Sequence, residues 1–267
     1  MVDFVNQSDK KKINFIERQI FIADELYAGN RPNKLTLEEN MLADLINNDN
    51  GSSGLLRSYI YNFLGIIKFD AIRQGNLINE EILKWYACTL GQAVTDGIQY
   101  FVCNGHPYRD SNKRYLAATA AHITHMLRDT KEDLKEGYYN FYGHEMEGPD
   151  DVWVRYRVNL ARRYFFEGKK YLDSLEALRC KIVGHLYCMR FERILDIIEK
   201  DGYQLRERYP SEVKGAAWIK YGWKAVIITV LHVIRKIFYQ VFWNSNGGGP
   251  VRFLPGMHIE DPGKYYF

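Results

Sequence analysis

The scarcity of proline is the feature that most constrains how this chain of 267 residues can fold. There are only 7 prolines, and four of them lie beyond residue 200. Between Leu55 and Arg206, no stretch has the Gly, Ser and Pro content of a linker. Because proline interrupts helices and inner strands, a long stretch with so few prolines favours long helices within one domain.

Apolar spacing and capping residues predict seven or eight helices and no strand of useful length. In residues 13–28, apolar side chains recur every three or four positions, which is typical of one helix face. Thr36 and Asn79 each precede acidic residues and an apolar run, so we expect both to cap a helix. Further helices are expected at residues 56–73, 110–136, 151–174, 175–200 and 215–243. The predicted fold is therefore all-α, a single-domain helical bundle over residues 1–267 with an irregular tail at 244–267.

The charge pattern argues against nucleic acid as a partner. The chain carries 36 Lys and Arg against 33 Asp and Glu, which gives a net charge of +3. The basic residues are interspersed with acidic ones and are not massed into one run. A content of 46% hydrophobic and 26% charged residues is ordinary for a globular protein. We therefore expect no nucleic-acid partner.

The cysteine pattern predicts unpaired thiols. The four cysteines form no CxxC pair and lie in apolar, helix-like segments, so we expect neither a zinc site nor a disulfide framework. This pattern predicts a reducing, cytoplasmic setting. The charged residues 3–12 lack the apolar segment of a signal peptide, which favours the same localisation.

Residues 225–234 form the most apolar part of the chain. Thr229 and His232 are its only polar members, and Lys224 and the pair Arg235 and Lys236 bracket it. A membrane span needs about twenty residues, roughly twice this length. A core helix is the favoured interpretation, and an interfacial helix that makes peripheral membrane contact is the alternative.

One helix face between residues 122 and 140 gathers the residues with the clearest chemical potential. At about 100° per residue, an arc of about 80° on this face holds His122, His125, Asp129, Asp133 and Glu136. Mg²⁺ prefers one or two carboxylates with water and phosphate oxygens, which an Asp pair at i, i+4 offers to a diphosphate. The alternative is a solvated helix face whose acids are neutralised by Lys131 and Lys135.

The segment Met126–Gly137, MLRDTKEDLKEG, resembles the second aspartate-rich motif of the squalene/phytoene synthase family, which reads R-D-x-x-x-D and then glycine. Two weaker matches lie in the order found in that family. Residues 79–94 resemble a helix that carries a characteristic tyrosine, here Tyr86, and residues 194–203 resemble the end of phytoene synthase. The resemblance covers about residues 55–210 and implies a bundle of the isoprenoid synthase type with a central cavity.

The resemblance also implies an enzyme that uses Mg²⁺ and acts on an isoprenyl diphosphate. Such enzymes ionise an allylic diphosphate to a carbocation, for prenyl transfer or terpene synthesis. Asp129 and Asp133 would bind the metal from one side of the cavity. The best match to the family's first motif, D-D-x-x-D, retains only Asp24 and Glu25, because Ala28 stands at its last aspartate. These two acids would bind metal from the opposite side.

The remaining site residues are also implied by the resemblance. Tyr86 and Arg128 are the expected catalytic residues. A carbocation needs a dry pocket with electron-rich walls, which aromatic side chains provide. The expected substrate-binding residues are Arg18, Arg128, Tyr61, Tyr86, His122 and His125.

Two other functions fit the same residues. A non-catalytic prenyl-lipid-binding protein of the same fold is suggested by Ala28 in the first motif. A metal-dependent helical hydrolase or oxidase would instead use His122, His125 and Asp129 to hold Zn²⁺ or Fe²⁺.

Overall fold

The computed structural model describes residues 7–49, 54–103, 110–141, 150–210 and 216–245. These residues form helices and no strand, which confirms the all-α prediction. The expected tail lies outside the described residues from 246 onward. The helices are α1 (Gln7–Tyr27), α2 (Leu37–Asn47), α3 (Leu55–Arg73), α4 (Glu80–Cys103), α5 (Leu116–Lys135), α7 (Asp150–Ser174), α8 (Leu178–Lys200) and α9 (Ala216–Ser245).

Side-chain caps explain where two of the helices begin. The Thr36 hydroxyl accepts from the Glu39 backbone amide, and the Glu39 carboxylate accepts from the Thr36 amide at 2.8 Å. Asn79 Oδ1 accepts from the Ile82 amide at 2.8 Å. Both predicted caps are confirmed. The helix expected from residue 110 begins only at Leu116, because residues 112–115 form turns.

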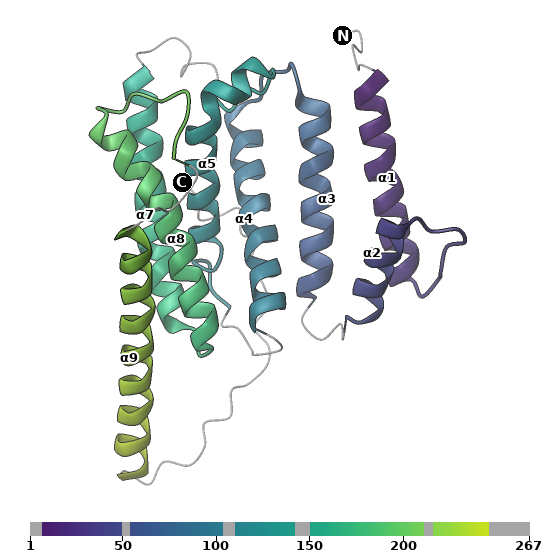
Figure 1. The fold of residues 1–267 in the computed structure, drawn as a ribbon. Coiled ribbons are helices and arrows are strands. Elements are labelled where there is room, and N and C mark those ends of the chain that lie inside the picture. The colour runs from purple at the N-terminus through teal and green to yellow at the C-terminus, as the bar shows by residue number, and fades with distance from the viewer. Residues whose placement is uncertain (1–6, 50–53, 104–109, 142–149, 211–215, 246–267) are drawn as a thin grey trace.

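The helices pack largely in chain order. Helices α1, α3, α4 and α5 lie side by side in a row, and α7 and α8 pack against α5 (Figure 1). The largest core cluster lies around α4, α5, α7 and α8 and includes the fully buried Leu127, Phe165 and Leu195. A smaller cluster joins α1, α2 and α3 around Ile22 and Leu56. Helix α5 therefore lies within the larger core.

Gly168 on α7 allows close contact with α5. A Cβ at this position would lie 2.5 Å from the backbone nitrogen of Ala117 and 2.9 Å from its Cα. We expect Gly168→Ala to lower the free energy of unfolding by about 1–3 kcal/mol, because the backbone of α5 would have to move away. Gly65 on α3 has nothing within 4 Å of an added Cβ. As the matched control, Gly65→Ala should raise stability by about 0.5–1 kcal/mol. Urea unfolding measures both, and equal stability of the two variants would contradict the close α5–α7 contact.

One cysteine pair is joined across the fold, so the prediction of unpaired thiols is wrong for it. Cys103 at the end of α4 and Cys180 in α8 form a disulfide, with their Cα atoms 6.0 Å apart. The residues are 77 positions apart in sequence and meet because α4 packs on α8. Local spacing could not reveal this pair. The disulfide also removes the basis for inferring a reducing, cytoplasmic setting from the cysteines, although Cys88 and Cys188 are free as expected.

Helix α9 lies at the edge of the bundle, where α8 is its main neighbour. Within the described part of the helix, Ile228 is the buried apolar residue, whereas Val226, Ile227 and Val230 are about half exposed. The interpretation of residues 225–234 as a core helix is therefore wrong. None of the described helices is both long and apolar enough to span a bilayer.

Candidate functional site

Two glycine turns bring the C-terminal ends of α3 and α5 together. Gly75 follows α3 with φ 79° and Gly137 follows α5 with φ 81°, a left-handed conformation that glycine adopts without a steric cost. The Gly75 amide donates to the Gly137 carbonyl at 2.8 Å. The Tyr138 amide donates back to the Asp133 carbonyl at 2.8 Å, which closes the last turn of α5. The last turn of α3 therefore lies beside the carboxylates of α5.

Asp133 is a half-buried carboxyl in the last turn of α5. Burial, reinforced by the negative charge of Asp129, raises its pKa to about 6. The positive charge of Arg73 opposes this shift but does not cancel it. Asn140, brought back by the turn, donates from Nδ2 to Asp133 Oδ2 at 2.6 Å. Burial and the neighbouring Asp129 therefore outweigh the positive charge of Arg73 at this carboxyl.

Asp129, one turn earlier, is held by Arg128. Arg128 donates from Nε and Nη2 to the two carboxylate oxygens, each at 2.6 Å. His125 Nδ1 lies 3.2 Å from Asp129 Oδ2, and His125 Nε2 lies 2.6 Å from Arg128 Nη2. Burial and the charge of Arg128 lower the pKa of His125. The structure thus brings together three of the residues predicted from the sequence.

His122 and Tyr86 form the inner part of the site. Their rings lie 4.8 Å apart between centroids. His122 is buried, and burial with the nearby charges of His125 and Arg73 lowers its pKa to about 3. Its Nε2 has no hydrogen-bond partner among the described residues. His122 is therefore a neutral imidazole at physiological pH.

Asp70 and Arg73 are site residues that the sequence reasoning missed. The Tyr86 hydroxyl donates to Asp70 Oδ2 at 3.0 Å, and Arg73 Nε donates to Asp70 Oδ1 at 2.7 Å. The buried Arg73 guanidinium also lies 4.9 Å from the Tyr86 ring centroid and 5.1 Å from that of Tyr138. In the sequence, the i, i+3 spacing of Asp70 and Arg73 is the only local signal of this network.

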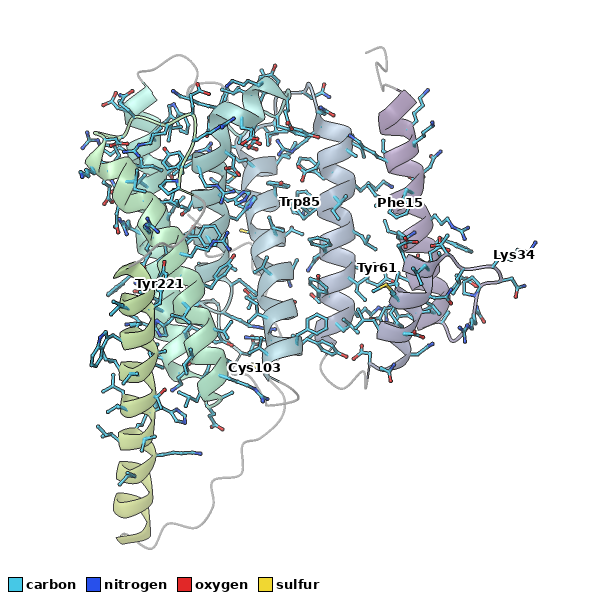
Figure 2. All side chains as sticks on the ribbon, viewed as in Figure 1. Phe15, Lys34, Tyr61, Trp85, Cys103 and Tyr221 are labelled. Atoms are coloured by element: carbon cyan, nitrogen blue, oxygen red, sulfur yellow. A yellow bond between two sulfur atoms is a disulfide. The ribbon has the colours of Figure 1, made fainter. Side chains whose placement is uncertain are left out.

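The other predicted site residues lie elsewhere. Asp24 accepts from the hydroxyl of Tyr61 at 2.5 Å, and Tyr61 extends from α3 toward α1 (Figure 2). Glu25 accepts from Asn30 at 3.2 Å. Arg18 forms a bidentate ion pair, at 2.5 and 3.0 Å, with the buried Glu39 of α2.

The structure does not bring the two acidic pairs together. Helix α1 packs against α2 and α3, whereas α5 packs against α4, α7 and α8. Helices α3 and α4 lie between α1 and α5 (Figure 1). Asp24 and Glu25 therefore do not face Asp129 and Asp133 across one cavity in this structure, and Arg18 does not reach the α5 site.

An apolar pocket lies toward the other end of α5, between α4, α5, α7 and α8. Its lining includes Thr95, Gln99, Ala118, Tyr171, Leu175 and Tyr187. Ala118 shares the α5 face of His122 and Asp129, since the three lie within about 40° of each other at 100° per residue. It lies about 16 Å from Asp129 along the helix axis, at about 1.5 Å per residue.

The donor set decides which metals this site fits. No three His, Cys, Asp or Glu side chains converge to hold a metal ion in the parts of the chain that the structure describes. Mg²⁺ needs only one or two protein carboxylates when phosphate and water complete its coordination. The carboxylate of Asp133, whose pKa is raised by burial and by the charge of Asp129, and that of Asp129 one turn away fit a Mg²⁺ ion shared with a phosphate ligand.

Comparison with known proteins gave no relative of this chain. No family model, no curated protein and no solved structure matches it.

Asp133→Asn is expected to stabilise the protein at pH 8 but not at pH 4. Because the folded-state pKa of about 6 lies above the ordinary value of about 3.9, the carboxyl stabilises the fold while protonated. This stabilisation is present below pH 4 and is lost as the pH rises through 6. An amide does not ionise, and its oxygen can still accept from Asn140. Thermal unfolding at both pH values measures the difference, and an equal difference at each would contradict a desolvated Asp133.

Proposed function

We propose that this protein is a Mg²⁺-dependent enzyme that acts on an allylic isoprenyl diphosphate. The observation that carries the proposal is the polarity of one α5 face. This face runs from the carboxylates of Asp129 and Asp133, past neutral His122, to an apolar pocket at Ala118. A charged end and an apolar end about 16 Å apart match the polarity of a ligand with a diphosphate head and a hydrocarbon chain.

The carboxylates and Arg128 of α5, together with Arg73 at the end of α3, would bind the diphosphate head. When bound, Mg²⁺ would supply positive charge that stabilises the negative charge growing on the leaving diphosphate. Asp129 and Asp133 would hold it. Arg128 neutralises Asp129 in the ligand-free protein and would turn to the phosphate oxygens once the carboxylate binds metal. Arg73, near Asp133, replaces Arg18 as the second cation of this proposal.

The proposed reaction begins with heterolytic cleavage of the allylic C–O bond, and the electron pair departs with the diphosphate. The π electrons of a double bond, in a second isoprenoid or in the same chain, then form a new C–C bond to the cation. The new cation that results loses a proton to the released diphosphate and becomes a neutral alkene. Tyr86 offers an aromatic ring beside the site, and burial raises the pKa of its hydroxyl, which stays protonated and held by Asp70. The neutral state of His122 suits this step, because a charged imidazole would repel a carbocation.

Turnover tests this proposal directly. The purified protein is incubated with C10, C15 and C20 allylic diphosphates, with Mg²⁺ or with EDTA, and released diphosphate and organic products are measured. We expect release with at least one chain length, dependent on Mg²⁺. If no diphosphate is released from any of the three substrates, the result would contradict the proposed enzymatic function.

A non-catalytic prenyl-lipid-binding protein is the second candidate. The observation that favours it is the separation of Asp24 and Glu25 from α5, which leaves the site with one acidic wall. Binding of a prenyl diphosphate without turnover, measured by calorimetry, would support this function. A His/Asp metal-dependent hydrolase or oxidase has less support, because both ring nitrogens of His125 contact Arg128 or Asp129.

A further inference from the structure

Helix α9 presents a broad apolar face to solvent. We call it the α9 stripe; its residues are 46–64% exposed and comprise Ile219, Trp223, Val226, Ile227, Val230, Leu231, Val233, Ile234 and Ile237. At about 100° per residue they occupy an arc of about 160°. The buried Ile228 lies on the other side of the helix, facing α8. The stripe is about 27 Å long at 1.5 Å per residue, so it is a continuous surface and not a scatter of single residues.

The position of α9 leaves this stripe uncovered within the described part of the protein. Helix α8 is its main neighbour, and the C-terminal half of α9 projects beyond the ends of α7 and α8 (Figure 1). Side chains along α9 project away from the bundle below Tyr221 (Figure 2). Exposed apolar area of this extent marks an interaction surface in soluble proteins.

The charge of α9 identifies the kind of partner. Its sequence contains Lys220, Lys224, Arg235 and Lys236 and no Asp or Glu. The chain as a whole has a net charge of only +3, so this helix is unusually basic for the molecule. By helical position, Lys224 and Arg235 follow one edge of the stripe and Lys236 lies beyond the other. An apolar face flanked by basic residues, with a tryptophan in it, complements an anionic lipid surface.

A second copy of the chain fits the α9 stripe less well. A coiled-coil seam uses two residues in seven, a narrower band than an arc of about 160°. Two α9 helices would also place basic residues against basic residues, with no acid on either helix to pair with them. An anionic bilayer surface accommodates both the width of the α9 stripe and the positive charge of α9.

We propose that α9 is an interfacial helix that lies along the surface of an anionic bilayer. The α9 stripe enters the boundary between headgroups and acyl chains, while Lys224 and Lys236 remain among the headgroups. The helix rests on the bilayer and does not cross it, in keeping with its hydropathy. The proposal is independent of the proposed enzymatic function, because it involves no residue of the α5 site.

Vesicle flotation of the full chain tests the proposal. The protein is mixed with vesicles of phosphatidylcholine alone or with phosphatidylglycerol added. We expect flotation with the anionic vesicles, weaker flotation with phosphatidylcholine alone, and a loss when the ionic strength rises from about 0.1 M to about 1 M, since the Debye length falls from about 10 Å to about 3 Å.

A matched pair of valines supplies the variant and its control. Val230 lies in the stripe and is 50% exposed, and Val152 lies on α7 and is 62% exposed. Val230→Glu should weaken vesicle binding by about tenfold or more, whereas Val152→Glu should bind like the wild type. Both sites are exposed, so both variants should keep the wild-type circular dichroism spectrum and melting temperature.

Three results would overturn the proposal. The first is a wild-type protein that does not float with anionic vesicles. The second is an equal loss of binding in the two valine variants. The third is a dimer, seen by light scattering without lipid, that Val230→Glu converts to a monomer, because a second copy would then cover the stripe.

Discussion

Asp129→Asn or Asp133→Asn lowers the rate of Mg²⁺-dependent diphosphate release by about 10²- to 10³-fold, the expected effect of removing one charged transition-state interaction. In the proposed function these two carboxylates hold the metal, and an amide in either position removes a negative charge where it is needed. Asp24→Asn, the same chemical change on α1, should change the rate by no more than a few fold, because Asp24 lies with Tyr61 and away from α5.

Rates at saturating substrate over a range of Mg²⁺ concentrations measure this difference. A weakened metal site raises the Mg²⁺ concentration needed for half-maximal rate, which a merely destabilised fold does not. Circular dichroism checks that each variant is folded. If Asp24→Asn is inactive while both α5 variants keep full activity, the assignment of the metal site is reversed. If none of the three substitutions changes the rate, the enzymatic function is contradicted in favour of the prenyl-lipid-binding function.

Cys103→Ser lowers the free energy of unfolding by about 2–4 kcal/mol, because the disulfide with Cys180 closes a long loop and restricts the unfolded chain. At about 2–4 °C per kcal/mol for a chain of this size, the melting temperature should fall by roughly 5–15 °C. Cys88→Ser, at a free cysteine of the same helix, is the matched control and should have a smaller effect.

Thermal unfolding with and without a thiol reductant separates the disulfide from the serine substitution itself. Reductant should lower the melting temperature of the wild type and of Cys88→Ser, and should leave Cys103→Ser unchanged. A wild-type protein that melts at the same temperature in both conditions would show that no disulfide contributes to its stability.

The local features of the fold were predictable from the sequence. Thr36 and Asn79 were identified as caps because a cap depends on residues three positions away. The start of α5 was misplaced because Asp110 and Ser111 look like capping residues, while the chain first forms turns before Leu116. Helix periodicity therefore located the elements but not every boundary.

For the candidate site too, local features could be predicted from the sequence and contacts between helices could not. The α5 face was predicted because its members lie on one helix, at spacings that fix their direction. Contacts between helices were not predictable: Asp70 meets Tyr86 across α3 and α4, and Arg18 pairs with Glu39 of α2. These partners depend on how helices pack, which a single sequence does not encode locally.

The backbone hydrogen bond between Gly75 and Gly137 indicates a second role for the aspartate-rich segment, which is to shape the surroundings of its own carboxylates. Gly137, the last residue of MLRDTKEDLKEG, contributes no acidic, basic or metal-binding side chain. Its backbone conformation nevertheless allows the chain reversal that places Asn140 against Asp133. The same reversal meets the one after α3 and brings Arg73 near that carboxyl. The proton affinity of Asp133 is thus governed partly by main-chain geometry. The motif therefore contains both candidate metal ligands and the glycine whose backbone conformation sets the surroundings of Asp133.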